Sequence, residues 1–158
     1  MAAPTLTDLI YLKKNYLTKD QCEIIINEFE ASSQKPDQEH CGHAFNHLDV
    51  YSTFKVKESE VGSDSFNIIH QTIENIINEY HDYLDTFNAF HVARRGSMLH
   101  PHKYRLMKYE KGAWIHPHID HDVTIYGSCT INLNDEYEGG DFAFWGGQHK
   151  LKLGLGHS

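Results

Sequence analysis

The sequence predicts an α+β domain in which helices come first and a run of short antiparallel strands follows. Residues 17–29 and 63–84 repeat apolar side chains every three or four positions, as the buried face of an amphipathic helix does. The second half instead carries short alternating stretches rich in β-branched and aromatic residues, separated by glycine-containing turns. We therefore expect N-terminal helices packed on strands that fold as a sandwich or barrel.

Length and composition fit one ordered domain of 158 residues, with residues 1–90 as mainly helical support and 91–158 as the strand-rich portion. The 22 acidic and 14 basic side chains give a net charge of −8, which argues against a general nucleic-acid-binding protein. Three cysteines without a C-x-x-C pair indicate neither a disulfide framework nor a thiolate zinc knuckle. Neither a secretory signal nor a membrane-spanning stretch is visible, so we expect a cytoplasmic protein without a membrane partner.

The first helix begins with a capping-box pattern, because Thr18 can cap it and Gln21 follows three residues later. Its predicted apolar face consists of Cys22, Ile24, Ile25 and Phe29. The polar residues 32–49 are predicted to be a loop, and Val50–Val56 a strand. The loop carries Cys41, His40, His43 and His47. Their spacing fits no standard zinc finger, so solvated histidines are favoured over a zinc site.

The second helix is predicted to begin at Ser63 or Asp64 and to pack its stripe on a sheet. The stripe consists of Phe66, Ile69, Ile73, Ile76, Ile77, Tyr80 and Leu84. After it, Arg94-Arg95-Gly96 is predicted to be a solvated basic turn rather than a substrate contact. Further strands are predicted at Tyr104–Tyr109, around His118, and at Thr124–Leu133, Asp141–Trp145 and Gln148–Leu153. Asn134–Gly140 and Gly146-Gly147 are the predicted turns between the later strands.

The triplet His118-Ile119-Asp120 is the candidate metal site. In an extended strand alternate side chains share a face, so one imidazole and one carboxylate can reach the same ion. Two histidines and one carboxylate on one face of a ferrous ion leave positions open for oxygen and a co-substrate. An H-x-D triplet alone is weak evidence, since it occurs by chance in many chains. The nearby His100, His102, His116, His121 and Asp122 are predicted to line a polar rim, with a zinc cluster as the alternative.

Four motifs occur in an order that resembles the iron(II)- and 2-oxoglutarate-dependent dioxygenases of the prolyl 4-hydroxylase-like branch. They are Leu17–Cys22, Tyr109-x-x-Gly112 followed by His118-x-Asp120, Thr130–Asn134, and Glu138-Gly139-Gly140-Asp141-Phe142. The resemblance covers residues 104–145 well and the remainder loosely. It implies a double-stranded β-helix, or jelly roll, flanked by helices. It also implies hydroxylation of a C–H bond of a peptidyl (for instance prolyl) or small-molecule substrate, with release of succinate and CO2 and with ascorbate as a further cofactor.

By this resemblance, His118 and Asp120 are two iron ligands, and Tyr109 hydrogen-bonds a carboxylate of 2-oxoglutarate. For Tyr109 the alternative is an aromatic residue in the core of its strand, and both interpretations stay open. Asn132 is a candidate for the same pocket, although a structural role is the favoured interpretation. The substrate is not identified by the sequence.

The resemblance also implies a third ligand and a cationic anchor for 2-oxoglutarate that are not evident after Asp120. His149 lies too early and His157 has no strand after it, while Lys150 and Lys152 also lie too early. We therefore expect a jelly roll that lacks its last strands, whether as a fragment, a natural truncation or a frame-shifted product. The open sheet edge would then need a partner chain or a dimer to cover it. An inactive jelly-roll relic and a cupin-like or zinc-dependent binding module are the competing functions.

Overall fold

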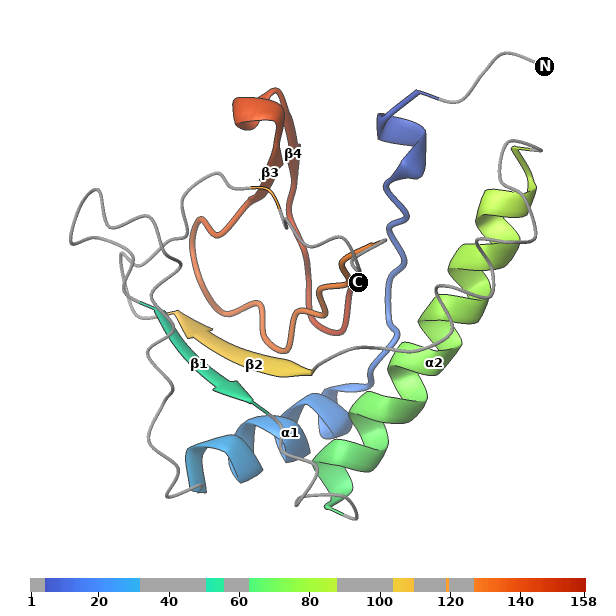
Figure 1. Ribbon diagram of the computed structural model, residues 1–158. Helices are drawn as coiled ribbons and strands as arrows, with labels where there is room; N and C mark the ends of the chain where they lie inside the picture. Colours follow the sequence, from blue (N-terminus) through green and yellow to red (C-terminus); the bar gives the residue numbers. More distant parts are fainter. Residues whose placement is uncertain (1–4, 32–50, 56–62, 88–103, 110–118, 120–126) are drawn as a thin grey trace.

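A computed structural model describes residues 5–31, 51–55, 63–87, 104–109, 119 and 127–158 (Figure 1). Its helices are the 3-10 helix η1 (Thr7–Leu9), α1 (Lys19–Ala31), α2 (Asp64–Asp85) and the 3-10 helix η3 (Trp145–Gly147). Its strands are β1 (Tyr51–Lys55), β2 (Arg105–Tyr109), β3 (Phe142–Phe144) and β4 (His149–Leu151). Helices together with antiparallel strands confirm the α+β class. Within the described part of the chain, no helix is both long and apolar enough to cross a membrane.

The start of α1 confirms the predicted capping box. The Thr18 backbone N–H donates to Gln21 Oε1 at 2.9 Å, and the Gln21 backbone N–H donates to Thr18 Oγ1 at 3.2 Å. Cys22 and Ile25 on the inner face are 1% and 0% exposed, so Cys22 is a core residue as predicted. Ile24 is 38% exposed, and its assignment to the buried face is wrong, because it lies about 100° around the helix from Ile25.

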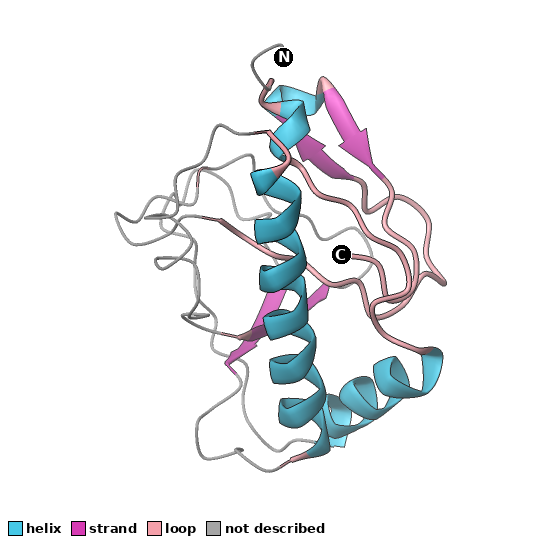
Figure 2. Cartoon of the chain, turned by 90° about the vertical axis from the view of Figure 1, so that its right-hand side faces the viewer, coloured by secondary structure: helices cyan, strands magenta, loops and turns pink. Residues whose placement is uncertain are grey.

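The second helix begins at Asp64, with Ser63 as its cap. Ser63 Oγ accepts a hydrogen bond from the Phe66 backbone N–H at 3.1 Å. The predicted stripe is confirmed: Ile69, Ile76 and Leu84 are buried, and Phe66, Ile73, Ile77 and Tyr80 are half-buried. Leu17, Cys22, Ile25 and Ile69 form the core cluster, on which partly buried side chains of β2 and of the C-terminal region pack. The longer helix lies across one end of α1 (Figure 2).

Two separate antiparallel pairs make up the described sheets. Strands β1 and β2 pair in the register Tyr51↔Tyr109 to Lys55↔Arg105, which confirms both predicted strands. Strands β3 and β4 pair as a hairpin in the register Phe142↔Leu151 to Phe144↔His149. The predicted turn at Gly146-Gly147 is confirmed, and both glycines have positive φ.

The described part of the predicted strand Thr124–Leu133, residues 127–133, is not a strand. Its hydrogen bonds go to the end of the chain instead. The Asn132 backbone N–H donates to His157 O at 2.9 Å, and the Gly156 N–H donates to Asn132 O at 2.8 Å. One paired residue does not make a ladder, so the predicted strand is replaced by an extended segment with irregular pairing. Residues 134–140 form a loop with bends that leads into β3.

Candidate functional site

The two predicted metal ligands, His118 and Asp120, lie outside the described residues, as do Gly112, His116, His121 and Asp122. Between them, Ile119 is described and its side chain is 84% exposed. Among the residues that the structure describes, no group of three or more His, Cys, Asp or Glu side chains lies close enough to hold a metal ion. The structure therefore describes only the elements that flank the candidate metal centre.

Strand β2 brings Tyr109 to the side of the sheet that faces away from the helices. On the helix side, Tyr104 and Leu106 pack on the core cluster, and Lys108 Nζ lies 2.7 Å from Glu30 Oε1 of α1. Met107 and Tyr109 alternate onto the other side, and each is 43% exposed. Tyr109 therefore lies outside the core that β2 shares with the helices.

The Asn132 side chain is engaged by the chain itself. Its Nδ2 donates to Asn134 O at 2.5 Å and lies 3.4 Å from Leu153 O, while Tyr137 Oη donates to its Oδ1 at 3.1 Å. These contacts tie residues 132–137 to the chain that follows β4. They are the contacts of a structural role, which was the favoured interpretation of this residue.

His149 and His157, the two histidines considered as a third ligand, are held by their neighbours. His157 Nδ1 accepts a hydrogen bond from the Gly154 backbone N–H at 2.9 Å, closing a turn at the end of the chain. The His149 ring lies 6.2 Å and 6.0 Å from the rings of Phe144 and Trp145 in the β3–β4 hairpin. Each imidazole is thus part of a local packing or hydrogen-bonding arrangement.

Two polar clusters on α2 were not predicted. His70 Nδ1 and Tyr104 Oη share a hydrogen bond of 2.6 Å, and His70 Nε2 lies 3.5 Å from Glu74 Oε1. Burial raises the pKa of the Tyr104 phenol, and the nearby Glu74 charge adds to this shift. The i, i+4 spacing of His70 and Glu74 is visible in the sequence, whereas their partner Tyr104, the residue before β2, is not.

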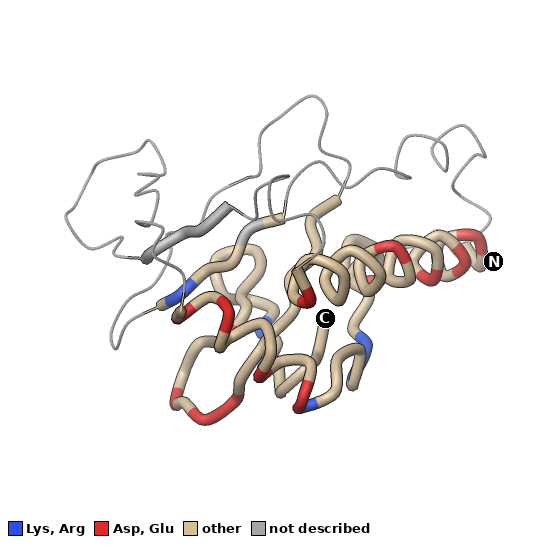
Figure 3. Tube along the Cα trace, turned by 90° about the horizontal axis from the view of Figure 1, so that it is seen from below, with Lys and Arg blue, Asp and Glu red and all other residues tan. Residues whose placement is uncertain are grey.

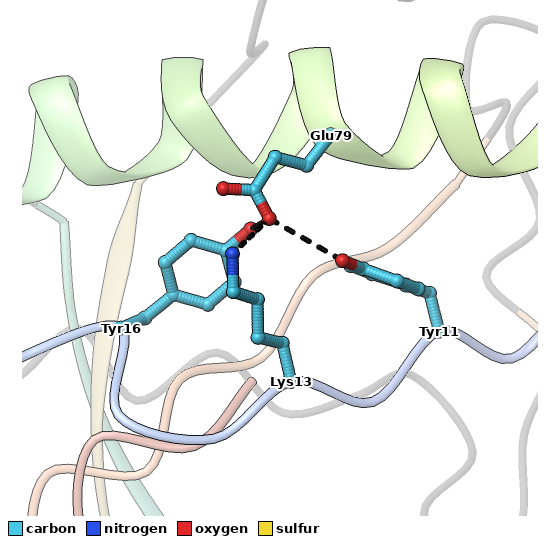
Figure 4. Close-up of polar contacts among 4 residues, drawn as sticks. All are labelled: Tyr11, Lys13, Tyr16 and Glu79. Atoms are coloured by element: carbon cyan, nitrogen blue, oxygen red, sulfur yellow. Dashed lines mark hydrogen bonds and ion pairs between the residues drawn. The ribbon is translucent and has the colours of Figure 1, made fainter.

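The second cluster surrounds Glu79 (Figure 4). Glu79 Oε2 accepts hydrogen bonds from Tyr16 Oη at 2.6 Å, from Tyr11 Oη at 3.3 Å and from Lys13 Nζ. Hydrogen bonds from Lys13 and then Tyr16 lower the pKa of the Glu79 carboxyl. Burial, followed by the hydrogen bond to Glu79, raises the pKa of Tyr16. Acidic side chains recur along both helices (Figure 3), so nothing in the sequence distinguishes Glu79 from the other acidic residues.

Comparisons with protein-family models, with curated proteins and with solved structures found no match to this chain.

Proposed function

We propose that the chain is an Fe(II)- and 2-oxoglutarate-dependent oxygenase domain that hydroxylates a C–H bond of a peptidyl or small-molecule substrate. In this proposal the strands belong to a jelly roll, His118 and Asp120 hold the iron, and Tyr109 contacts the co-substrate. The single observation that carries it is the placement of Tyr109. Its side chain is 43% exposed on the face of β2 opposite the helices.

The two faces of β2 have different surroundings. In a jelly roll flanked by helices, the helices cover the outer face of one sheet, and a ligand site lies between the sheets. Leu106 and Lys108 point to the helices, so the opposite face, which carries Tyr109, is the inner face of the proposed jelly roll. His118 follows nine positions later, a separation that lets a turn bring the next strand alongside.

Ile119, the middle residue of the H-x-D triplet, is exposed. Its apolar side chain is 84% exposed, so it is not directed into a core. By the alternation of an extended chain, we expect its two neighbours, His118 and Asp120, on the opposite side of the backbone from Ile119 and on the same side as each other. That is the arrangement an H-x-D metal site needs.

The donor set fits a ferrous ion at two of three protein positions, an imidazole and a carboxylate. When bound, the iron would supply the activation of dioxygen that drives decarboxylation of 2-oxoglutarate and hydroxylation of the substrate. The Tyr109 phenol would donate a hydrogen bond to a carboxylate oxygen of 2-oxoglutarate and fix its orientation. The substrate class stays open between peptide side chains and small molecules.

Succinate formation in the presence of Fe(II), ascorbate and 2-oxoglutarate tests the proposal, with metal binding measured by calorimetry in parallel. We expect His118→Ala and Asp120→Ala to weaken Fe(II) binding by at least about tenfold. Asp141→Ala, which alters an exposed carboxylate outside the proposed site, is the matched control. Tyr109→Phe is expected to raise the KM for 2-oxoglutarate while leaving Fe(II) affinity unchanged.

Three outcomes separate this proposal from its competitors. Absence of succinate together with unchanged iron binding in His118→Ala would reject the oxygenase. Iron binding that depends on His118 and Asp120 without turnover would identify an inactive relic. Stoichiometric zinc that survives Asp120→Ala would identify a zinc-dependent binding module.

A further inference from the structure

The segment before α1, residues 5–17, lies along the C-terminal half of α2 (Figures 1 and 4). We call it the N-terminal segment. Besides the Glu79 cluster, Tyr80 Oη donates to Leu9 O at 2.8 Å and Tyr83 Oη donates to Asp8 O at 2.7 Å. The Tyr11 ring lies 4.9 Å from the Tyr83 ring. Side chains at successive turns of α2 therefore hold this segment, and Glu79 is the one charged acceptor among these contacts.

The opposite edge of the N-terminal segment pairs with residues 154–158, which we call the C-terminal segment. The Lys13 N–H donates to Ser158 O at 2.7 Å, and the Ser158 N–H donates to Lys13 O at 3.0 Å. The Tyr16 N–H donates to Gly156 O at 2.8 Å. Gly156 has φ +65, and a Cβ there would lie 2.3 Å from Leu17 O. The two segments can therefore approach this closely only with glycine at position 156.

The C-terminal segment is in turn the backbone partner of Asn132. Both the N–H and the carbonyl of Asn132 bond to it, through His157 O and the Gly156 N–H. Leu17 is buried, and Leu155 and Ile131 pack on the same core cluster. One continuous set of contacts therefore runs from Glu79 through the N-terminal and C-terminal segments to Asn132.

We propose that the N-terminal and C-terminal segments open and close as one unit, and that Glu79 is the latch that holds the unit on α2. Release of Glu79 removes all three side-chain donors of residues 11–16 from α2 at once. The C-terminal segment then loses its ordered partner at Lys13 and Tyr16, which weakens its remaining contacts, among them those with Asn132 and with Asp135 Oδ2. The side chains of Lys13 and Glu79 are 39% and 38% exposed, so water reaches the latch without any unfolding of α2. This inference is independent of the oxygenase proposal.

Hydrogen exchange of five backbone amides tests the unit directly. They are the donors Lys13, Tyr16, Asn132, Gly156 and Ser158. In Glu79→Gln, which removes the charge and keeps an acceptor oxygen, we expect all five to exchange about tenfold faster by a common factor. Amides in the middle of α1 and α2 should keep their protection. Glu74→Gln, on the same helix and 49% exposed beside His70, is the matched control and should change none of the five.

Two results would overturn the proposal. Faster exchange at Lys13 and Tyr16 with unchanged exchange at Gly156 and Ser158 would show that the segments open separately. An equal change at every amide, including those within α2, would show only a loss of global stability. Tyr16→Phe, which removes one donor to Glu79, is the milder second variant if Glu79→Gln does not fold. It must accelerate the same five amides by a smaller common factor, and no common acceleration would count against the latch.

Discussion

The layer formed by α1 and α2 and the hairpin formed by β3 and β4 are held together by different means. The helices bury Cys22, Ile25, Ile69 and Ile76, each at 8% exposure or less. The hairpin rises away from them (Figure 1), and none of its residues 142–151 is buried. Its Phe142 and Trp145 are 41% and 40% exposed. Its shape comes from local turn geometry, with positive φ at three consecutive residues, 145–147.

Stability is therefore unevenly distributed between these two regions. Burial of apolar side chains stabilises a fold in proportion to the area removed from water. Of these two regions, the helical layer therefore gains more stability from burial. A two-stranded hairpin with exposed aromatic residues contributes little on its own. Paired substitutions, one in each region, test whether the two regions contribute unequally to stability.

The largest expected effect is from Ile25→Ala in the helical layer. Its side chain is fully buried, so truncation should lower the free energy of unfolding by about 2–5 kcal/mol. Phe142→Ala removes a larger side chain from the hairpin but should cost less than about 1 kcal/mol, because Phe142 is 41% exposed. Urea unfolding measures both. Equal costs at the two positions would contradict the contrast.

A second pair compares two glycines with the same backbone angle. Gly156 and Gly146 both have φ +65, but a Cβ at Gly146 meets nothing within 4 Å. Gly146→Ala should cost about 1–2 kcal/mol, the left-handed strain alone. Gly156→Ala adds a clash with the Leu17 carbonyl and should cost clearly more, by the same unfolding measurement. Similar costs would show that the terminal segments yield without penalty.

A third change acts on the cap of α1. Thr18→Ala should lower the free energy of unfolding by about 1 kcal/mol, because the Gln21 N–H loses its acceptor. Thr18→Ser keeps the hydroxyl and should recover most of that loss in the same thermal or urea unfolding experiment. No recovery with serine would show that the methyl group, rather than the hydroxyl, matters at this position.

The smallest effect is expected from lowering the pH, which should speed hydrogen exchange in the terminal segments. The pKa of Glu79 is lowered in the fold, so its contribution is present above the unfolded pKa of the carboxyl and is lost as the pH falls through the folded value. The groups facing it are Lys13, Tyr11 and Tyr16, with Tyr83 and Cys129 beside the tyrosines. Below about pH 4 the terminal segments should exchange faster, whereas residues 142–151, which carry no carboxylate, should not respond. In Glu79→Gln this acid dependence should shrink to the part contributed by Asp8, whose pKa is also lowered, by hydrogen bonds from Thr5.

Local sequence signals predicted much of the helical layer. The capping box of Thr18 and Gln21, the cap at Ser63 and the stripe from Phe66 to Leu84 are short-range patterns, and each is confirmed. The position of Ile24 was wrong because adjacent isoleucines fit a helical stripe equally well, and only packing chooses between them. Nonlocal partners escaped prediction for the same kind of reason. Neither Glu79 with Tyr16 nor Asn132 with Gly156 is marked by spacing, since these partners meet only through the tertiary fold.

The candidate site was predicted from the motif His118-x-Asp120, and the structure describes residues around its two ligands but not the ligands themselves. Tyr109 lies on the face that the proposed site needs, while Asn132 is occupied by Tyr137 and backbone carbonyls. Sequence spacing suggested that Tyr109 and Asn132 share one pocket, but it could not show that the Asn132 side-chain amide forms hydrogen bonds within the chain. The iron ligands, the co-substrate and the jelly roll therefore stay predictions.

The pairing of Lys13 with Ser158 has a consequence for biosynthesis. A ribosome delivers Lys13 well before Ser158, so the backbone partners of the N-terminal segment emerge only after both helices have been made. Until then Leu17 lacks the neighbour that Gly156 provides. We expect a nascent chain in which α1 and α2 have met while residues 5–17 remain exposed to chaperones until residues 154–158 have been made.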